Sequence, residues 1–275
     1  MVFCFILILS HNNENISKIK NIWIRNNYLK NSIFYDFLFI EYNNDIQLDY
    51  LIDENTKTLQ IKGRDSIIPG CFNKTIKAIE IVKNIYKPKF ILRTNISTYF
   101  NFHLLEKIIN KINNRNKEKI PLCICGPILN LETQNDVKLF IQNLNQLNLI
   151  NTNNIKDKEM LNQILNEKVK KVKLNYIHGI FMLLDSNSYD FLINNYDKEK
   201  VNLYNDDVLI SLAFKKNNYP LISIKNKLEL NTNTLKNIEI NSTYVNSNIY
   251  FRCKMNTDYS LSYEMINKIN NLLNY

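Results

Sequence analysis

Glycine is scarce in this sequence. Four of the 275 residues are glycine: Gly63, Gly70, Gly126 and Gly179. The dinucleotide-binding G-x-G-x-x-G motif and the P-loop each need closely spaced glycines, because the backbone must turn tightly around a phosphate. Neither motif occurs, nor does the G-x-S-x-G turn of α/β-hydrolases. The sequence therefore disfavours a Rossmann dinucleotide enzyme, a P-loop NTPase and an α/β-hydrolase.

Histidine and cysteine are also few. With three histidines, a zinc site or a Ser-His hydrolase site is hard to build. The five cysteines are an odd number in a long chain, which argues against a disulfide framework. Cys123 and Cys125 form a C-x-C pair, but no second Cys/His pair stands at zinc spacing. We expect these two cysteines to share one face of a strand.

No apolar run is long enough to span a membrane as a helix. The first ten residues, Met1–Ser10, are apolar but lack the basic start and small-residue cleavage site of a signal peptide. They predict a fully buried first strand. We therefore expect a soluble protein in a reducing, cytoplasmic compartment.

Basic residues outnumber acidic ones but form no block. The chain has 35 Lys and Arg against 26 Asp and Glu, a net charge of +9, and a pI near 9.1. This balance favours an anionic partner. Because the positive charges are spread along the chain, we expect no specific nucleic-acid partner; non-specific nucleic-acid binding is supported by the net charge alone.

The first half alternates strand-like and helix-like segments, which is typical of a parallel sheet with helices on its faces. Apolar runs predict strands, and apolar residues at helical spacing predict helices. The expected strands are Val2–Leu9, Ile33–Ile40, Thr58–Ile61 and Phe90–Leu92; the expected helices are Asn15–Leu29, Phe72–Tyr86 and Phe102–Ile112.

The second half is less regular. Its expected strands are Leu122–Ile124, Val172–Leu174, Gly179–Leu184, Leu221–Ile224 and Ile249–Cys253; its expected helices are Ser186–Asn195, Asp206–Lys216 and Tyr259–Leu273. The polar stretch Asn130–Lys171 has no clear pattern and could hold a loop or helices that cover a site. Since no linker or repeat occurs, we expect one α/β domain over residues 1–275.

Polar residues follow several expected strands. Ser10 ends the first strand, Lys62 begins the loop after the third, and the segment Arg93–Thr98 follows Phe90–Leu92. In open parallel sheets, ligands bind beyond the carboxyl ends of the strands. We expect these groups to converge on one edge of the sheet.

Four segments, in order, resemble the GT-A glycosyltransferases, in particular the β-1,3-galactosyltransferase and fringe-like branch and its viral and microbial relatives. Ile8–Ser10 with Trp23 is similar to the first strand and helix of that family. Asn73–Lys77 is similar to its Leu-Thr-x-Lys-Thr helix. Phe90–Ser97 stands where the family has a strand that runs into Lys-Thr-Asp-Asp-Asp, and Asn205–Val208 stands where it has Glu-Asp-Val.

The resemblance implies a Rossmann-like fold of the GT-A type, with a mixed, mostly parallel central sheet flanked by helices. Within this single domain it implies a nucleotide-sugar-binding half (1–115) and an acceptor-binding half (116–275). It also implies transfer of a hexose from a nucleoside-diphosphate sugar, with UDP as the expected nucleotide, to a hydroxyl of a glycan or protein acceptor, with inversion. If the chain is viral, this takes place in the host cytoplasm. The residues that it places at the donor are Ser10, Lys62, Arg93, Thr94, Asn95, Ser97, Arg252 and Lys254.

One departure from the family concerns the metal. The family's Asp-x-Asp holds a divalent ion on the donor diphosphate, whereas Asn95 and Ser97 occupy those places here. Neutral side chains bind Mn²⁺ or Mg²⁺ more weakly than carboxylates do. Three explanations stay open: the metal is held through waters or another carboxylate, Lys and Arg replace it, or the enzyme is degenerate. In the last case the chain is a nucleotide- or glycan-binding protein without turnover.

The resemblance places the catalytic base at Asp207, with Asp206 as the alternative or as its partner. It places His178 and Gly179 at the acceptor. The same Asn205–Asp207 segment is also good capping chemistry for the start of a helix. Arg252 and Lys254 are expected to point the same way on a strand, either as a phosphate clamp or as a protective strand edge.

Overall fold

A computed structural model describes residues 2–11, 13–66, 69–115, 120–131, 174–198, 201, 205–224, 226, 240–254 and 259–275. Most of the expected loop or helical segment 130–171 lies outside these residues. Within them, no helix is both long and apolar enough to cross a membrane.

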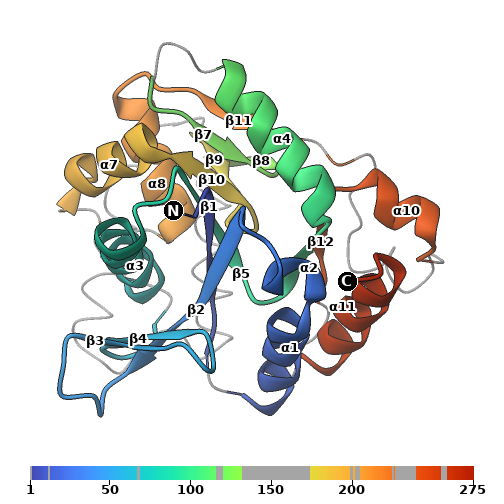
Figure 1. The fold of residues 1–275 in the computed structure, drawn as a ribbon. Coiled ribbons are helices and arrows are strands. Elements are labelled where there is room, and N and C mark those ends of the chain that lie inside the picture. The colour runs from blue at the N-terminus through green and yellow to red at the C-terminus, as the bar shows by residue number, and fades with distance from the viewer. Residues whose placement is uncertain are drawn as a thin grey trace.

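A central sheet of eight strands organises the molecule (Figure 1). Its strands, in spatial order, are β11 (Leu221–Ser223), β7 (Cys123–Cys125), β10 (Met182–Asp185), β5 (Phe90–Asn95), β1 (Cys4–Leu9), β2 (Tyr35–Asn43), β4 (Thr58–Lys62) and β3 (Tyr50–Asp53). Strands β5, β1, β2 and β4 run parallel, as do β7 and β11. Strand β10 is antiparallel to both of its neighbours, and β3 is antiparallel to β4. The expected mixed, mostly parallel sheet is therefore confirmed.

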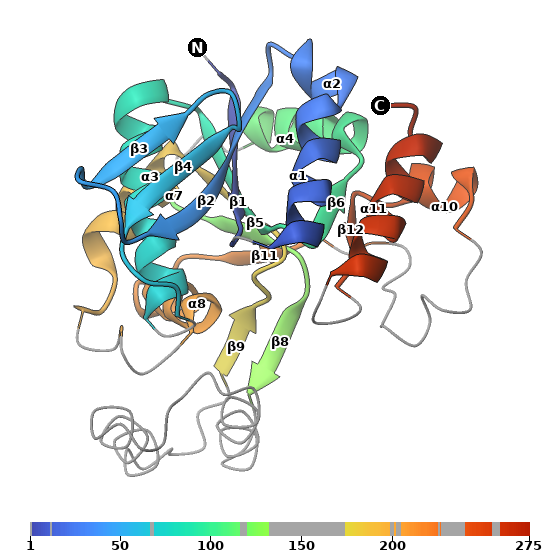
Figure 2. The same cartoon turned by 90° about the horizontal axis from the view of Figure 1, so that it is seen from below.

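Helices cover both faces of this sheet, as expected. On one face lie α1 (Glu14–Arg25), α2 (Asn27–Lys30), α4 (Phe102–Arg115), α10 (Ser242–Ser247) and α11 (Ser260–Leu272); on the other lie α3 (Gly70–Tyr86), α7 (Ser186–Asn195) and α8 (Asp206–Lys216) (Figures 1 and 2). In β1, Cys4, Ile6 and Ile8 pack towards the first layer, and the alternate residues pack towards the second. Because a strand covered on both faces has no solvent side, its sequence is a continuous apolar run.

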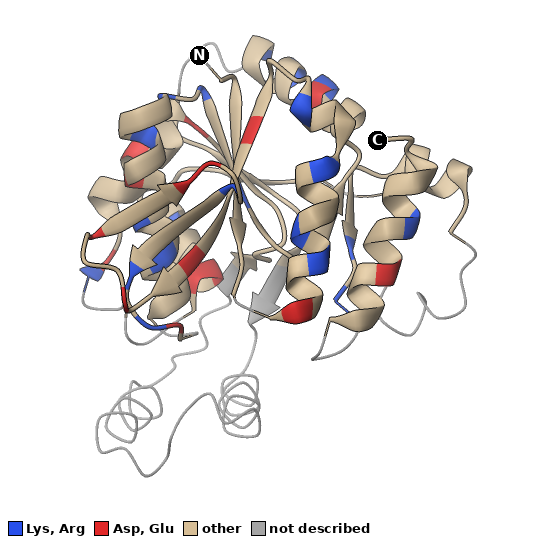
Figure 3. Ribbon diagram, turned by 60° about the horizontal axis from the view of Figure 1, so that its bottom comes forward, with Lys and Arg blue, Asp and Glu red and all other residues tan. Residues whose placement is uncertain are grey.

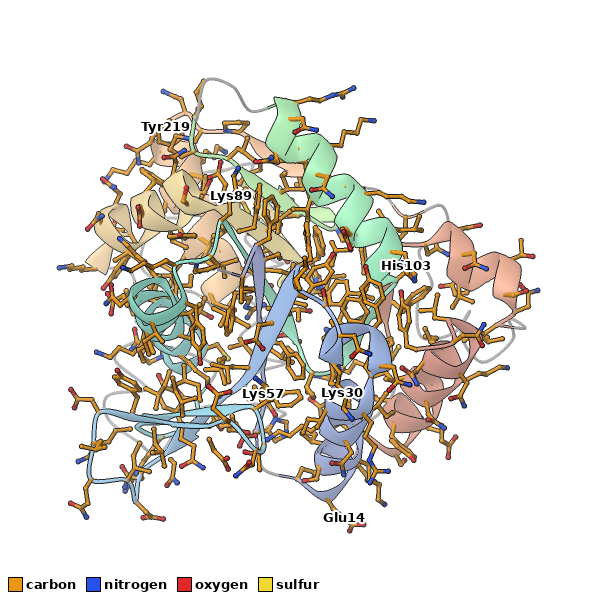
Figure 4. The ribbon with its side chains drawn as sticks, viewed as in Figure 1. Glu14, Lys30, Lys57, Lys89, His103 and Tyr219 are labelled. Carbon is orange, nitrogen blue, oxygen red and sulfur yellow. The ribbon has the colours of Figure 1, made fainter. Side chains whose placement is uncertain are left out.

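Charged residues lie mainly on the helices and loops outside the sheet (Figure 3). Glu14, at the start of α1, points away from the body of the protein (Figure 4). The charged residues that the described structure buries are Lys74, Arg93, Asp185 and Asp206. Burial of a charge destabilises the folded protein unless the charge is paired. These four residues therefore need polar partners within the folded protein.

Two small antiparallel sheets lie beside the main one. The sequence predicted a strand over Ile249–Cys253 in one of them and a strand that ends at Leu174 in the other, but it did not predict their partner strands. Strand β6 (Thr98–Phe100) pairs with β12 (Tyr250–Arg252), and β8 (Ile128–Leu131) pairs with β9 (Leu174–Ile177). The β6–β12 pair matters for the site, because it brings Arg252 opposite Thr98, directly after β5.

The structure corrects three predicted boundaries. The helix expected over Asn15–Leu29 is two helices, since Asn26 ends α1 and caps α2. The strand expected over Gly179–Leu184 begins at Met182, and Gly179 lies in the preceding turn. The strand expected over Val172–Leu174 is described only from Leu174 onwards, as β9.

The prediction for the cysteines is confirmed. Cys123 and Cys125 are buried in the same apolar cluster, on one face of β7. All five cysteines are free thiols.

Candidate active site

Arg93 is the centre of a buried polar cluster at the carboxyl end of β5. Arg93 stands two residues after Ile91 in β5, so both side chains are on the face of the sheet that α3 and α8 cover. The Arg93 side chain is 3% exposed. Nη2 pairs with the Asp206 carboxylate, and Nη1 donates to the Gly179 carbonyl. Both terminal nitrogens are thus bonded within the protein, while Nε is buried without a partner among the described residues, so Arg93 positions the groups around it.

The first turn of α8 carries the two expected carboxylates. Asn205 caps this helix, because its side chain accepts from the Val208 N–H at 3.3 Å. Asp206 and Asp207 follow as the first helical residues, where a helix N-terminus favours negative charge. The capping role is thus carried by Asn205, and the two aspartates make contacts outside the helix instead.

Asp207 is the more accessible of these two carboxylates. Its side chain is 17% exposed, against 8% for Asp206. Its Oδ2 accepts from the Gly179 N–H at 2.8 Å, and its Oδ1 lies 4.0 Å from Arg93 Nη1. Burial, and then the neighbouring Asp206 charge, raise the pKa of Asp207, while Arg93 and the Gly179 N–H oppose that rise. A partly exposed carboxyl with a raised pKa is suited to proton transfer near neutral pH.

Gly179 is required at its position by close approach. A Cβ atom there would stand 2.9 Å from Asp207 Cγ and 2.5 Å from Arg93 Nη1. The turn that carries Gly179 therefore passes directly over the Arg93–Asp207 contact. Of the residues expected at the acceptor, Gly179 is the one that touches the candidate base.

His178 borders the same cluster as a neutral imidazole. Burial, with the positive charges of Arg252 and Arg93, lowers its pKa to about 4. Its Nδ1 is buried and has no hydrogen-bond partner in the described part of the chain. The ring lies close enough to Arg252, Arg93 and Asp206 for their charges to act on it.

Arg252 ends β12 beside the turn that follows β5. Its Cα is paired with that of Thr98, and the next residue, Cys253, donates its N–H to the Ser97 carbonyl at 2.8 Å. The Nη1 atom of Arg252 is buried without a partner among the described residues. Burial lowers the pKa of Arg252, and Asp207 and Arg93 are near enough for their charges to act on it.

Lys254 lies two residues further along and is exposed. The expectation that Arg252 and Lys254 share a strand is wrong, because β12 ends at Arg252. Partial burial, followed by the Arg252 charge, lowers the pKa of Lys254.

Asn95 and Ser97 form the end of β5 and the turn after it. Asn95 is half-buried, and Ser97 is 2% exposed. Within the described residues, no group of three His, Cys, Asp or Glu side chains is arranged to hold a metal ion. Together with the neutral Asn95 and Ser97, this ligand set does not fit Mn²⁺ or Mg²⁺.

Two other residues expected at the donor are engaged in the protein itself. The Ser10 hydroxyl donates to Glu41 Oε1 at 2.9 Å, and Glu41 pairs with Lys20 at 2.8 Å. The Thr94 hydroxyl is fully buried and donates to the Ile180 carbonyl at 2.6 Å. Both residues help to shape the edge of the sheet.

Lys62, which was expected at the donor, is less buried than Lys74, which was not. Lys62 is exposed at the end of β4. Lys74, on α3, is buried; its Nζ donates to the Ser10 carbonyl at 3.2 Å and pairs with Asp65. Sequence analysis did not name Lys74 as a site residue, although the Asn73–Lys77 segment that contains it carried part of the resemblance.

Tyr259 was also missed, and His11 was not assigned a role. Their rings lie edge to face, with centroids 5.5 Å apart. His11 follows directly after Ser10, and burial lowers its pKa, with Asp65 opposing. The polar residues that follow β1, β4 and β5 were a usable signal for His11; Tyr259 reaches the site from a distant segment that carries no local motif.

Comparison with solved structures finds 46 chains that match this one. No family model and no curated protein matches the chain. The chain is similar to a crystal structure described as a glycosyltransferase involved in the glycosylation of the major capsid of PBCV-1, with 9% identity and a TM-score of 0.47 over 96% of this chain and 99% of that one. Similarity at this level does not indicate an activity, so the expected relation to the β-1,3-galactosyltransferase and fringe-like branch stays a prediction.

Proposed function

We propose that the protein is a glycosyltransferase that moves a hexose from a nucleoside-diphosphate sugar to an acceptor hydroxyl. In this reaction Asp207 takes the hydroxyl proton as the acceptor oxygen attacks the anomeric carbon. The bond from that carbon to the diphosphate oxygen breaks, and the nucleoside diphosphate leaves with the electron pair. Attack from the face opposite the leaving group inverts the anomeric centre.

The main support for this proposal is the environment of the Asp207 carboxylate. Its carboxylate is partly exposed, lies beside a second carboxylate, and is held in place by Gly179 and Arg93. It stands at the carboxyl end of the parallel strands, where open α/β sheets bind their ligands. Burial and a like charge together are the usual means by which a carboxyl is given a pKa suited to acid–base work.

The proposal assigns a role to each of the surrounding residues. Arg93 and Asp206 position Asp207, while Ser10, Thr94, Asn95 and Ser97 shape the donor side of the edge. His178 and the Gly179 turn border the acceptor side. UDP is the expected nucleotide, and a glycan or a protein side chain is the expected acceptor.

A second function is favoured by the neutral pair Asn95 and Ser97. If these substitutions abolish turnover, the chain binds a nucleotide or a glycan at the same edge without transfer. The two functions differ in whether diphosphate is released from the donor.

The test is an assay of nucleoside-diphosphate release across a panel of UDP- and GDP-sugars, with Mn²⁺ and, in parallel, with EDTA. Asp207→Asn keeps the size and the hydrogen-bond acceptor of the side chain but removes the base. We expect release to fall by about 100-fold or more. The exposed Asp45, changed to Asn, is the matched control and should retain full activity.

Full activity in Asp207→Asn would exclude this residue as the base. No release by the wild-type protein, together with binding of UDP in calorimetry, would favour the binding function instead.

A further inference from the structure

The site has a cation where the resemblance leads one to expect a metal. Register in the β6–β12 sheet places Arg252 opposite Thr98, and the Cys253 N–H bonds the Ser97 carbonyl. Arg252 therefore lies against the Asn95–Ser97 turn. The contact joins segments that are about 155 residues apart in the sequence, and it is made by backbone pairing that does not depend on a flexible side chain.

The Arg252 guanidinium has an unsatisfied buried nitrogen. Nη1 is shielded from solvent and has no hydrogen-bond partner in the described part of the molecule. A buried donor without a partner destabilises the folded protein, and a charged donor does so more. Arg252 Nη1 lies in a polar cluster with Asp207 and His178, so its unpaired N–H is explained if a bound ligand supplies the acceptor.

The acidic side chains at this edge are already engaged. Their partners lie within the protein: Asp206 pairs with Arg93, Asp207 accepts from Gly179, and Asp65 pairs with Lys74. A divalent ion at the Asn95–Ser97 turn would meet neutral oxygen atoms. A diphosphate at the same turn would meet Arg252, with the exposed Lys254 beyond it.

We propose that Arg252 replaces a divalent metal ion in this site and binds the diphosphate of a nucleoside diphosphate directly. This inference rests on the proposed function for the identity of the ligand. A guanidinium presents several N–H donors in a plane and forms charge-assisted bonds to phosphate oxygens. Its positive charge also stabilises the leaving diphosphate as negative charge develops there.

The experiment is calorimetric binding of UDP, and of GDP in parallel, to the full chain. Each titration is run in EDTA and in MnCl₂. For the wild-type protein we expect the two dissociation constants to agree within about twofold, because the charge is balanced by the protein. Binding should weaken as salt is raised, because salt screens the long-range attraction between the basic protein and the anionic nucleotide.

Substitution at Arg252 tests the residue itself. Arg252→Gln should weaken UDP binding in EDTA by about tenfold or more, and Arg252→Lys, which keeps the charge but loses the planar fork, should weaken it less. Arg115→Gln is the matched control, because Arg115 is exposed at the far end of α4. Thermal unfolding of each variant shows whether the fold is kept.

Two results overturn the inference: wild-type binding that requires Mn²⁺, or unchanged UDP binding by Arg252→Gln. The wild-type titration needs no variant, so a misfolded substitution does not leave the question open. Failure of the two proposals can also be told apart. If sugar transfer requires Mn²⁺, the role of Arg252 is wrong and the transferase function stands. If UDP binding resists EDTA and depends on Arg252 but no diphosphate is released, the transferase function is wrong and the role of Arg252 stands.

Discussion

At the scale of single residues, Asp207 shows how surroundings change a common side chain. The same carboxylate on an exposed helix start would be a capping group of little consequence. Here Asn205 takes over the capping, and Arg93, Asp206 and Gly179 surround the carboxyl. The pKa of Asp207 rises because burial and a like charge outweigh one arginine and one N–H.

The raised pKa of Asp207 predicts the pH dependence of activity. A base must be ionised to act, so kcat/KM should rise with pH through the raised pKa of Asp207 and level off above it. A pH–rate profile of diphosphate release checks this. A rate that falls over the same interval would show that the protonated form of Asp207 is the active one.

The same shift predicts how stability depends on pH. Because the folded protein holds the Asp207 proton more tightly than the unfolded chain does, this residue stabilises the fold most below the ordinary pKa of aspartate. That contribution is lost as pH rises from the ordinary pKa to the raised one. Asp207→Asn carries no such proton. As pH rises across this window, the melting temperature of the wild type should therefore fall relative to that of Asp207→Asn.

At the scale of elements, the break between α1 and α2 depends on one buried side chain. The Asn26 Oδ1 atom accepts from the Leu29 N–H at 2.9 Å, and its Nδ2 donates to the Tyr99 hydroxyl at 2.7 Å. Tyr99 in turn donates to Asn270 on α11 at 2.6 Å. One asparagine thus starts a helix and joins α1 to the β6 segment.

Asn26→Ala should destabilise the protein by about 2 kcal/mol, through loss of a helix cap and of a buried hydrogen bond. Urea unfolding measures the change. The exposed neighbour Asn27, changed to Ala, serves as the control and should cost less than about 0.5 kcal/mol. Equal effects of the two substitutions would contradict the role assigned to Asn26.

The elements that could be predicted from the sequence are those with a strong local pattern. The helices α7 and α8 have the predicted bounds, since apolar residues after a polar start mark each of them. The strands β3, β6 and β8 were missed. They have three or four residues, and their partners determine that they are strands, so no local periodicity identifies them.

At the scale of the whole molecule, the two halves of the chain share one sheet. Strand β5 comes from the first half and pairs with β10 from the second, and β10 also pairs with β7. The nucleotide-binding and acceptor-binding halves expected from the sequence are therefore joined through backbone hydrogen bonds. Each half contributes only part of the eight-stranded sheet.

Unfolding should accordingly occur in a single transition. The one tryptophan, Trp23, is buried on α1 and reports on the first half, while far-UV circular dichroism reports on all helices and strands. The two signals should give the same urea midpoint, as two-state unfolding requires. Separate midpoints would show that residues 1–115 and 116–275 are independent domains.

Local patterns in the chain determine the order of the main elements, the burial of the central strands and the edge of the sheet at which polar residues gather. These features follow from apolar periodicity and from the residues at strand ends, which are properties of short segments. The contacts of the candidate site depend on tertiary folding, because they join residues far apart in the chain. Arg93 meets Asp206 across 113 positions, and Arg252 reaches the Asn95–Ser97 turn only through the pairing of β6 with β12.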